Sequence, residues 1–192
     1  GPQRSTTSGG SWIGPTGVAS GDRFNWSTPL VMNPKNHNVI LFGSQRVYRS
    51  TNNGVAYSVI SGDLTTNNPS SLLTYSTITA LDISPADTSV YYAGTDDGRV
   101  WRSTNRGGSW TDISAGLPVR WVTGVTADPV NAQVVYVTHS GFGADEHVPH
   151  VHRSADQGTT WAAIDGNLPD VPVNDVVVDP ADTQRLYLAT DI

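Results

Sequence analysis

Short apolar runs alternate with polar turns along the whole chain, and none of them shows the helical period of 3.6 residues. Four runs end in a proline: STPLVMNP, ITALDISP, VTGVTADP and VNDVVVDP. After a polar turn, a second run follows each of them: VILFGS, VYYAGT, VVYVTH and RLYLAT. Val, Ile and Tyr are frequent in these runs, while Gly, Pro, Asn and Asp bound them, so the pattern predicts β-strands.

Two further short strands follow in each repeat, joined by a turn that occurs four times. The turns begin at Ser5, Ser50, Ser103 and Ser154, at spacings of 45, 53 and 51 residues. Each repeat is thus predicted to contain four strands within about 50 residues, which is typical of a β-propeller blade. We expect an all-β propeller built of four-stranded antiparallel blades.

The repeats predict that residues 1–192 form a single propeller segment, with three whole blades and two complementary half-blades. The blades are expected at about 27–67, 77–118 and 121–168, and the half-blades at 1–20 and 172–192. Either the two halves pair and close a four-bladed ring, or the chain is part of a larger propeller, which we favour. Unpaired strand edges of the half-blades would also allow self-association.

The repeat turns, defined as residues 5–12, 50–57, 103–110 and 154–161, are rich in residues that stabilise tight turns. Serine, Asn and Asp side chains bond nearby backbone amides, glycine adopts positive φ, and an aromatic ring anchors the turn. We expect a structural role for the following residues: Ser5, Gly9, Trp12, Ser50, Asn52, Gly54, Tyr57, Ser103, Asn105, Gly107, Trp110, Ser154, Asp156, Gly158 and Trp161.

The repeat turns resemble the Asp-box, or BNR repeat, of sialidase-like propellers, whose pattern is S-x-D-x-G-x-x-W. The last turn matches at every position, whereas Asn or Thr replaces the Asp in the other three and Tyr57 replaces the Trp in one. In that superfamily the motif lies at the blade periphery, so the resemblance implies a fold rather than an activity. Arginines precede the turns once per repeat, which indicates a structural role rather than a sialidase site: Arg4, Arg49, Arg102 and Arg153.

A second resemblance is to the xyloglucan-cleaving propeller hydrolases, which carry such repeats and place a catalytic acid in a TD-x-G-G loop. TDDG at 95–98 and TDI at 190–192 are similar, so this resemblance implies Asp96 or Asp191 as a catalytic carboxyl. Arg99 replaces the second glycine of the first loop. A glycosidase needs a second carboxyl roughly 5–9 Å away, and the available residues are Asp22, Asp63 and Asp97. Alternatively, these aspartates bond loop amides.

Histidines gather at the long loop between the second and third strands of one repeat. His150 and His152 are two residues apart, so on a strand they face one side, and His139 lies just upstream. With His147 and a neighbouring carboxylate, they form a candidate site for a divalent metal. The spacing matches no standard zinc motif, and a solvated loop with one histidine packed where another repeat has Trp101 is the alternative.

Two tryptophans outside the repeat turns, Trp26 and Trp121, stand just before first strands, at the expected mouth of the central channel. Their rings are predicted to stack on sugars or, alternatively, to pack within the rim. The longer loop adds His147 and His150 as candidate ligand contacts, because function concentrates in loops on rigid scaffolds.

The amino-acid composition limits the classes of partner and cofactor that we expect for this protein. The net charge of −6 and the single lysine provide no basic stripe for nucleic acid. No apolar run approaches the roughly 18 residues of a membrane span, so we expect no membrane insertion. The absence of cysteine excludes disulfides, and no cofactor other than the candidate metal is expected. No signal peptide is visible, and GPQ resembles a tag-cleavage remnant; we expect an extracellular or periplasmic protein whose leader was removed.

The pattern therefore favours a non-catalytic binding or scaffold module of an exported bacterial protein. We expect such a module to recognise glycan or protein through loops on one face. One alternative is a fragment of a glycoside hydrolase that resembles the xyloglucan-cleaving propellers, and another is a purely structural repeat segment. A carboxyl pair that faces one cleft would favour the hydrolase.

Overall fold

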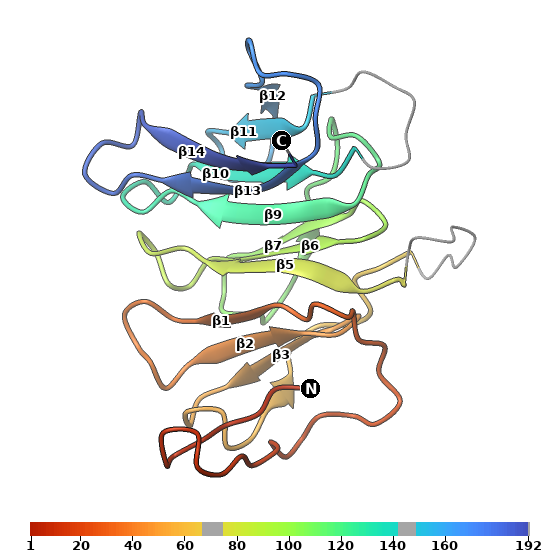
Figure 1. Ribbon diagram of the computed structural model, residues 1–192, viewed down its shortest axis with the longest axis vertical. Coiled ribbons are helices and arrows are strands. Elements are labelled where there is room, and N and C mark those ends of the chain that lie inside the picture. Colours follow the sequence, from red (N-terminus) through yellow and green to blue (C-terminus); the bar gives the residue numbers. More distant parts are fainter. Residues whose placement is uncertain (67–74, 142–148, 192) are drawn as a thin grey trace.

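The computed structural model describes residues 1–66, 75–141 and 149–191. Three four-stranded antiparallel sheets and one two-stranded sheet follow one another along the chain and stack into an arc (Figure 1). No helix occurs among the described residues, and hence none that is long and apolar enough to cross a membrane. The expectation of an all-β protein built of four-stranded antiparallel blades is confirmed.

The strands fall into three blades and a half-blade. Blade 1 contains β1 (Leu30–Met32), β2 (Ile40–Gly43), β3 (Val47–Ser50) and β4 (Ser58–Val59). Blade 2 contains β5 (Ile78–Ile83), β6 (Tyr91–Thr95), β7 (Val100–Ser103) and β8 (Thr111–Asp112). Blade 3 contains β9 (Val122–Ala127), β10 (Val135–His139), β11 (Val151–Ser154) and β12 (Ala162–Ala163). The C-terminal half-blade contains β13 (Val173–Val178) and β14 (Leu186–Thr190).

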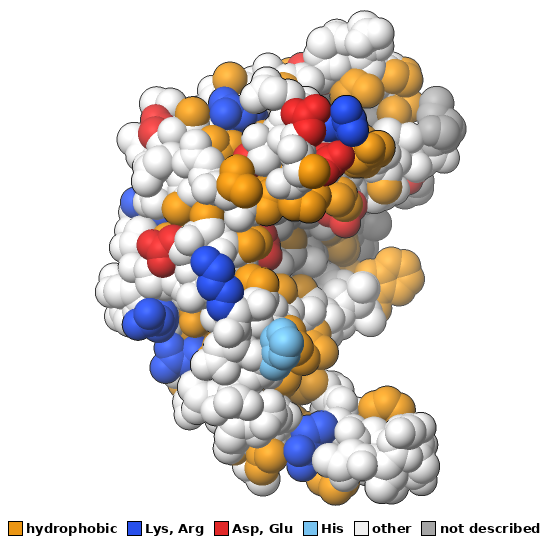
Figure 2. Space-filling view, turned by 90° about the vertical axis from the view of Figure 1, so that its left-hand side faces the viewer, with side chains coloured by type: hydrophobic (Ala, Val, Ile, Leu, Met, Phe, Trp, Pro, Cys, Tyr) orange, Lys and Arg blue, Asp and Glu red, His pale blue; other side chains and the backbone are white. Residues whose placement is uncertain are grey.

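The first strands of successive blades, β1, β5, β9 and β13, are neighbours and form the inner side of the arc. The space-filling view shows the molecule hollowed on that side (Figure 2). At the N-terminus, Arg4 pairs with Ile13, and Thr16 lies beside Ala56 of blade 1. This N-terminal hairpin and the C-terminal half-blade lie at opposite ends of the arc, so the four-bladed closed ring is not formed here (Figure 1).

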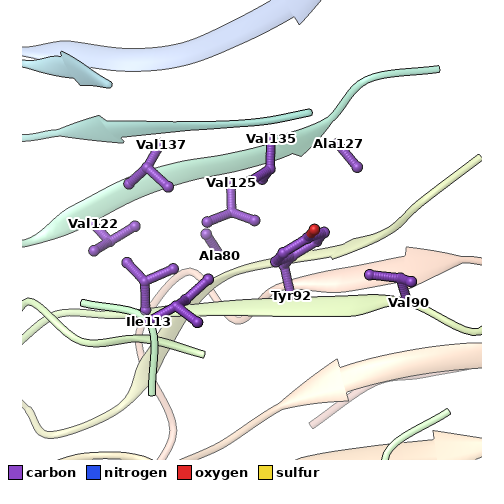
Figure 3. Packing of buried hydrophobic residues seen from close by; sticks show 10 residues of the cluster. Ala80, Val90, Tyr92, Ile113, Val122, Val125, Ala127, Val135 and Val137 are labelled. Atoms are coloured by element: carbon purple, nitrogen blue, oxygen red, sulfur yellow. The ribbon is translucent and has the colours of Figure 1, made fainter. Parts of the chain in front are cut away.

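The apolar core lies between the blades rather than within them. Between blades 2 and 3, Tyr92 and Ala80 of one sheet face Val125, Val135 and other side chains of the next (Figure 3). Similar clusters fill the junctions on either side of this one. Because a four-stranded sheet alone cannot cover its two faces, each blade depends on its neighbours for burial.

The repeat turns share one hydrogen-bond pattern. In the last turn, Ser154 Oγ accepts the backbone N–H groups of Asp156 at 3.2 Å and Gly158 at 2.7 Å. The Asp156 Oδ1 accepts the N–H of Thr160 at 2.8 Å. Hydrogen bonds from Thr160 and Ser154 lower the pKa of this exposed carboxyl to about 2. In the first turn, Thr7 Oγ1 takes over the role of the Asp and accepts the N–H of Ser11 at 2.8 Å.

The third and fourth repeat turns, at 103–110 and 154–161, are each linked through a tryptophan to the preceding blade. Trp110 Nε1 donates to the carbonyl of Ile60 at 2.9 Å, and Trp161 Nε1 donates to the carbonyl of Ile113 at 2.8 Å. Both isoleucines directly follow the fourth strand of the preceding blade. The sequence-predicted aromatic anchor of the turn therefore spans two blades rather than one.

The arginines that precede the turns reach the opposite way. Arg49 Nη1 donates to the carbonyl of Arg106 at 2.6 Å, and Arg102 Nη1 donates to the carbonyl of Gln157 at 2.8 Å. Both acceptors lie in the repeat turn of the next blade, where they adopt left-handed φ values of 59° and 58°. The turns thus hold adjacent blades together in both directions.

We predict that alanine at Gly107 destabilises the protein more than alanine at Gly9. Both glycines have positive φ, near 88°, but a Cβ at Gly107 would lie 2.3 Å from Ile60 Cδ1, whereas Gly9 has open space. Gly9→Ala therefore isolates backbone strain, at most about 1 kcal/mol. Gly107→Ala adds the blade-to-blade clash, about 1–3 kcal/mol more. Urea unfolding measures both, and equal effects would contradict the tight blade contact.

Candidate functional site

One face of the arc carries the segments that lead into the innermost strands. Because β1, β5, β9 and β13 occupy equivalent positions in their blades, they all begin on the same face. In the antiparallel blades, the turns between second and third strands return to that face as well. We call it the loop face; it is opposite to the side that carries the repeat turns. Three of the predicted ligand-contacting residues, Trp26, Trp121 and His150, belong to the loop face.

Aromatic side chains stand on three successive lead-in segments. Trp26 precedes β1 and is 89% exposed, and Tyr75 precedes β5 and is 58% exposed. Trp121 immediately precedes β9 and is half-buried. Asn25 Nδ2 donates to Thr77 Oγ1 at 2.9 Å, so the first two lead-in segments touch. Two of these rings, Trp26 and Tyr75, offer exposed flat apolar surfaces on adjacent lead-in segments. Tyr75 was not among the predicted residues.

The carboxylate of Asp22 is held by three side chains of blade 1. It accepts bonds from Tyr48 Oη at 2.6 Å, Ser44 Oγ at 2.9 Å and Gln45 Nε2 at 2.9 Å. Burial acts to raise the pKa of Asp22, but these hydrogen bonds outweigh it and lower the pKa below its ordinary value. Such a carboxylate stays ionised and fixes the loop around it.

Asp63 forms an ion pair with Arg23, whose Nη2 lies 2.7 Å from its Oδ2. The same guanidinium donates through Nε to the carbonyl of Ser76 at 3.1 Å. It also donates to Thr65 Oγ1 at 3.2 Å. The pair therefore ties the lead-in segments of blades 1 and 2 together.

Asp96, the predicted catalytic carboxyl of the TDDG loop, is buried. Its oxygens accept the backbone N–H groups of Tyr75 at 2.6 Å and Thr77 at 2.9 Å. Burial raises the pKa of Asp96 above its ordinary value despite these bonds. The neighbouring Asp97 accepts the N–H of Thr66 at 2.6 Å. These contacts are those expected if the aspartates bond loop amides, which was the alternative interpretation of the sequence.

Asp191, the second predicted carboxyl, lies beyond the end of β14 and is exposed. It accepts a bond from Asn174 Nδ2 at 2.7 Å. The structure places Asp96 and Asp191 in different blades, with blade 3 between them, and it does not bring them together as a pair. Both stay predictions as catalytic residues.

Asp82, on the innermost strand β5, is a carboxyl that the sequence pattern did not single out. It accepts the N–H of Ala127 in the next blade at 2.8 Å. Burial raises its pKa to about 6, and the charge of Asp175 on β13 adds to the rise. A pKa in that range suits a general acid, although the Ala127 contact is a structural link between blades.

A pocket of about 250 Å³ lies on the loop face between blade 3 and the half-blade. Its walls are mostly apolar, and its polar side chains are His150, Asp165 and Asp170. His150 Nε2 lies 3.2 Å from Asp170 Oδ1. His150 therefore lines a pocket, and its role as a ligand contact stays a prediction. His147 lies outside the described residues.

In the same blade, His139 and His152 are buried, with ring centroids 5.3 Å apart. Burial lowers the pKa of His139 to about 3, and the neighbouring His152 and His150 lower it further. Burial also lowers the pKa of His152. These imidazoles are neutral at pH 7. As the side chains stand, no three His, Asp or Glu groups of the described chain converge on a metal position.

The chain is similar in sequence to a polysaccharide-degrading enzyme. The xyloglucanase Xgh74A of Acetivibrio thermocellus is 30% identical over 134 residues, which cover 63% of this chain and 15% of that protein. No protein-family model matches the chain. The chain thus spans about 15% of the length of the curated relative.

Solved structures show the same fold. A GH74 enzyme from Niastella koreensis superposes with a TM-score of 0.68 over 85% of this chain and 26% of that one, at 21% identity. An ancestral GH74 enzyme gives a TM-score of 0.65 over 98% of this chain and 24% of that one, at 24% identity. The GH74 xyloglucanase from Xanthomonas campestris gives 0.63 over 84% and 26%, at 19% identity. The described arc is therefore a partial β-propeller of the kind found in these enzymes.

We predict that the Asp82 carboxyl makes stability depend on pH. The pKa of Asp82 is about 6 in the folded protein and 3.8 in the unfolded chain, so the folded protein binds the proton more tightly. The resulting stabilisation is complete below about pH 4 and is lost as pH rises through 6, by roughly 3 kcal/mol. Asp82→Asn should remove this component while keeping an acceptor for Ala127.

The measurement is urea unfolding of both proteins from pH 4 to pH 7.5. The difference between them isolates Asp82 from other titrating groups. Relative to the variant, the wild-type protein should lose stability across that range. A difference that does not change with pH would contradict the raised pKa.

Proposed function

We propose that this chain is a section of a glycoside hydrolase that acts on a β-glucan of the xyloglucan class. In this proposal the loop face forms one wall of the cleft that holds the glucan main chain. The 30% identity with the xyloglucanase of Acetivibrio thermocellus is the observation that carries it. A section of such a hydrolase replaces a free-standing binding module as the favoured function.

The row of aromatic side chains on the loop face supports the proposal. Trp26 and Tyr75 are exposed on adjacent lead-in segments, and Trp121 follows in the next blade. A glucan main chain is a row of flat pyranose rings with apolar faces, and aromatic rings bind such faces by stacking. Anchors on successive blades suit an extended polymer better than a single small ligand.

The carboxylates of the loop face support a binding role for the described residues. Asp22, Asp63 and Asp96 are each held by donors of the protein itself. A glycosidase needs one carboxyl to donate a proton and a second one across the cleft. We infer that this chain binds the glucan without cleaving it, and that cleavage requires the remainder of the longer enzyme.

Two finer features belong to the same proposal. The repeat turns act as Asp-boxes, structural units of the blade periphery that leave the loop face free for substrate. A hydrolase that degrades a large polysaccharide meets it outside the cell, which agrees with the predicted exported, extracellular or periplasmic location. Neither feature supplies a chemical group to the reaction.

Titration of the 192-residue chain with xyloglucan oligosaccharides tests the proposal, by isothermal calorimetry and by chemical-shift changes of the indole N–H signals. We predict binding, no release of reducing ends, and about fivefold to tenfold weaker binding by Trp26→Ala, since stacking contributes roughly 1 kcal/mol. Trp12→Ala is the matched control, because Trp12 is 64% exposed but stands in the first repeat turn.

The proposal that the loop face forms a wall of the cleft would be contradicted if the chain did not bind xyloglucan. It would also be contradicted if Trp26→Ala and Trp12→Ala lost equal affinity. Cleavage by the chain alone would overturn the binding-only role, and Asp96 and Asp191 would then be the first candidates for a catalytic carboxyl. Cleavage that disappears in Asp82→Asn would instead point to the carboxyl of raised pKa on β5.

A further inference from the structure

Blade 3 carries histidine at positions where the other two complete blades carry unrelated residues. At the end of each second strand, one backbone N–H bonds a carbonyl at the start of the third strand, at 2.9 Å in all three blades. The paired residues are Ser44 and Arg46, Thr95 and Arg99, and His139 and His150. Both members of this pair are therefore histidine only in blade 3.

A third equivalent position lies two residues further along the third strand. Tyr48 pairs with Phe42 in blade 1, and Trp101 pairs with Ala93 in blade 2. In blade 3 the position is His152, which pairs with Val137. Three neighbouring positions that vary independently in the other blades are thus all imidazoles here.

The three imidazoles are buried, and each has at least one ring nitrogen without a hydrogen-bond partner. His139, His150 and His152 are 0%, 6% and 5% exposed. Both ring nitrogens of His139, and the Nδ1 atoms of His150 and His152, are buried and have no hydrogen-bond partner. Buried polar groups are nearly always satisfied, so four unpartnered nitrogens in one cluster call for a ligand.

In the other blades the corresponding hydroxyl groups have partners. Ser44 Oγ accepts the N–H of Arg46 at 3.0 Å, and Thr95 Oγ1 accepts the N–H of Arg99 at 2.9 Å. These bonds close the turn between the second and third strands. The His139 ring makes no such bond, so the usual device for closing this turn is missing from blade 3.

The backbone brings the three side chains to one face of the β10–β11 pair. His152 is directly opposite Val137. His139, at the end of β10, and His150, just before β11, are each two residues from this pair, and the His139 N–H bonds the His150 carbonyl. Side chains two residues apart on a strand share a face. Two histidines at i and i+2 with a third on the adjacent antiparallel strand suit a three-histidine metal centre.

The ring spacing fits such a centre. Two imidazoles that bind one tetrahedral zinc at about 2.1 Å have ring centroids roughly 5 Å apart. The rings of His139 and His152 are 5.3 Å apart. Their present orientations do not aim the nitrogens at one point, so binding requires the rings to rotate.

His150 also has the partner that a metal-bound histidine usually has. Its Nε2 is 3.2 Å from Asp170 Oδ1, while its Nδ1 is buried and unpartnered. Ligating histidines commonly bond a carboxylate through the other ring nitrogen, which fixes the tautomer and the ring orientation. In this arrangement Nδ1 of His150 is the nitrogen left for the metal.

We propose that His139, His150 and His152 bind a divalent transition metal of the zinc class, with Asp170 orienting His150. The pocket that His150, Asp165 and Asp170 line provides an approach from solvent, and its two carboxylates favour a cation. The bound ion joins the end of β10 to the start of β11.

Zinc titration of the chelator-treated 192-residue chain tests the proposal, by calorimetry and by thermal unfolding. We predict one Zn²⁺ per chain and a rise in Tm on the order of 5 °C at saturation. Co²⁺ in the same site should show the visible absorption of a tetrahedral, nitrogen-ligated ion. Asp170→Asn should weaken binding about 10- to 100-fold. The Asp170 side chain is 42% exposed, and circular dichroism checks that this variant keeps the fold.

Matched variants distinguish this site from others. His139→Gln and His152→Gln should abolish stoichiometric binding, whereas His37→Gln and Asp182→Asn, both exposed and outside blade 3, should leave it unchanged. The proposal is overturned by the absence of binding at 0.1 mM Zn²⁺, a concentration on the order of 100 times a micromolar Kd. It is also overturned if binding survives in both His139→Gln and His152→Gln, or if only His147→Gln removes it.

Discussion

The link between the last two repeat turns, 103–110 and 154–161, and the preceding blade is the constraint on which the rest of the structure depends. A tryptophan indole bonds the preceding blade, and an arginine of that preceding blade bonds the turn from the other side. The apolar clusters lie between sheets, so the distance between adjacent blades decides whether the side chains of a cluster pack and stay buried. Because this link acts at the periphery, the loop face is free to vary, and it carries the aromatic row, the pocket and the histidine cluster.

Much of the fold could be predicted because the same short pattern is repeated four times. Serine, glycine and tryptophan in the repeat turns have roles that follow from local chemistry, and even Thr7 in place of Asp keeps the bond to Ser11. Local pattern does not show which blade a side chain will touch. The inter-blade direction of the Trp161 and Arg102 bonds therefore emerged only from the structure.

The candidate site was less predictable, because its properties come from burial by a neighbouring blade. Asp82 looks like a surface residue of an alternating strand, yet the next blade covers it and raises its pKa to about 6. His139 ends an apolar run, so its pairing with His150 depends on strand register. Asp96 was predicted from a loop motif, but its surroundings are backbone amides. The similarity to xyloglucanases thus supports a glucan-binding wall more directly than a complete catalytic pair.

The central claim is that the repeat-turn tryptophans hold the blades together. Its most direct measurement is the free energy of unfolding of Trp161→Phe beside Trp12→Phe, since Trp161 bonds Ile113 of the preceding blade and Trp12 is exposed. The account predicts a loss of about 1 kcal/mol or more for Trp161→Phe, where a buried carbonyl loses its donor, and almost none for Trp12→Phe. Equal and small effects would contradict it, because the tryptophans would then serve only their own turns.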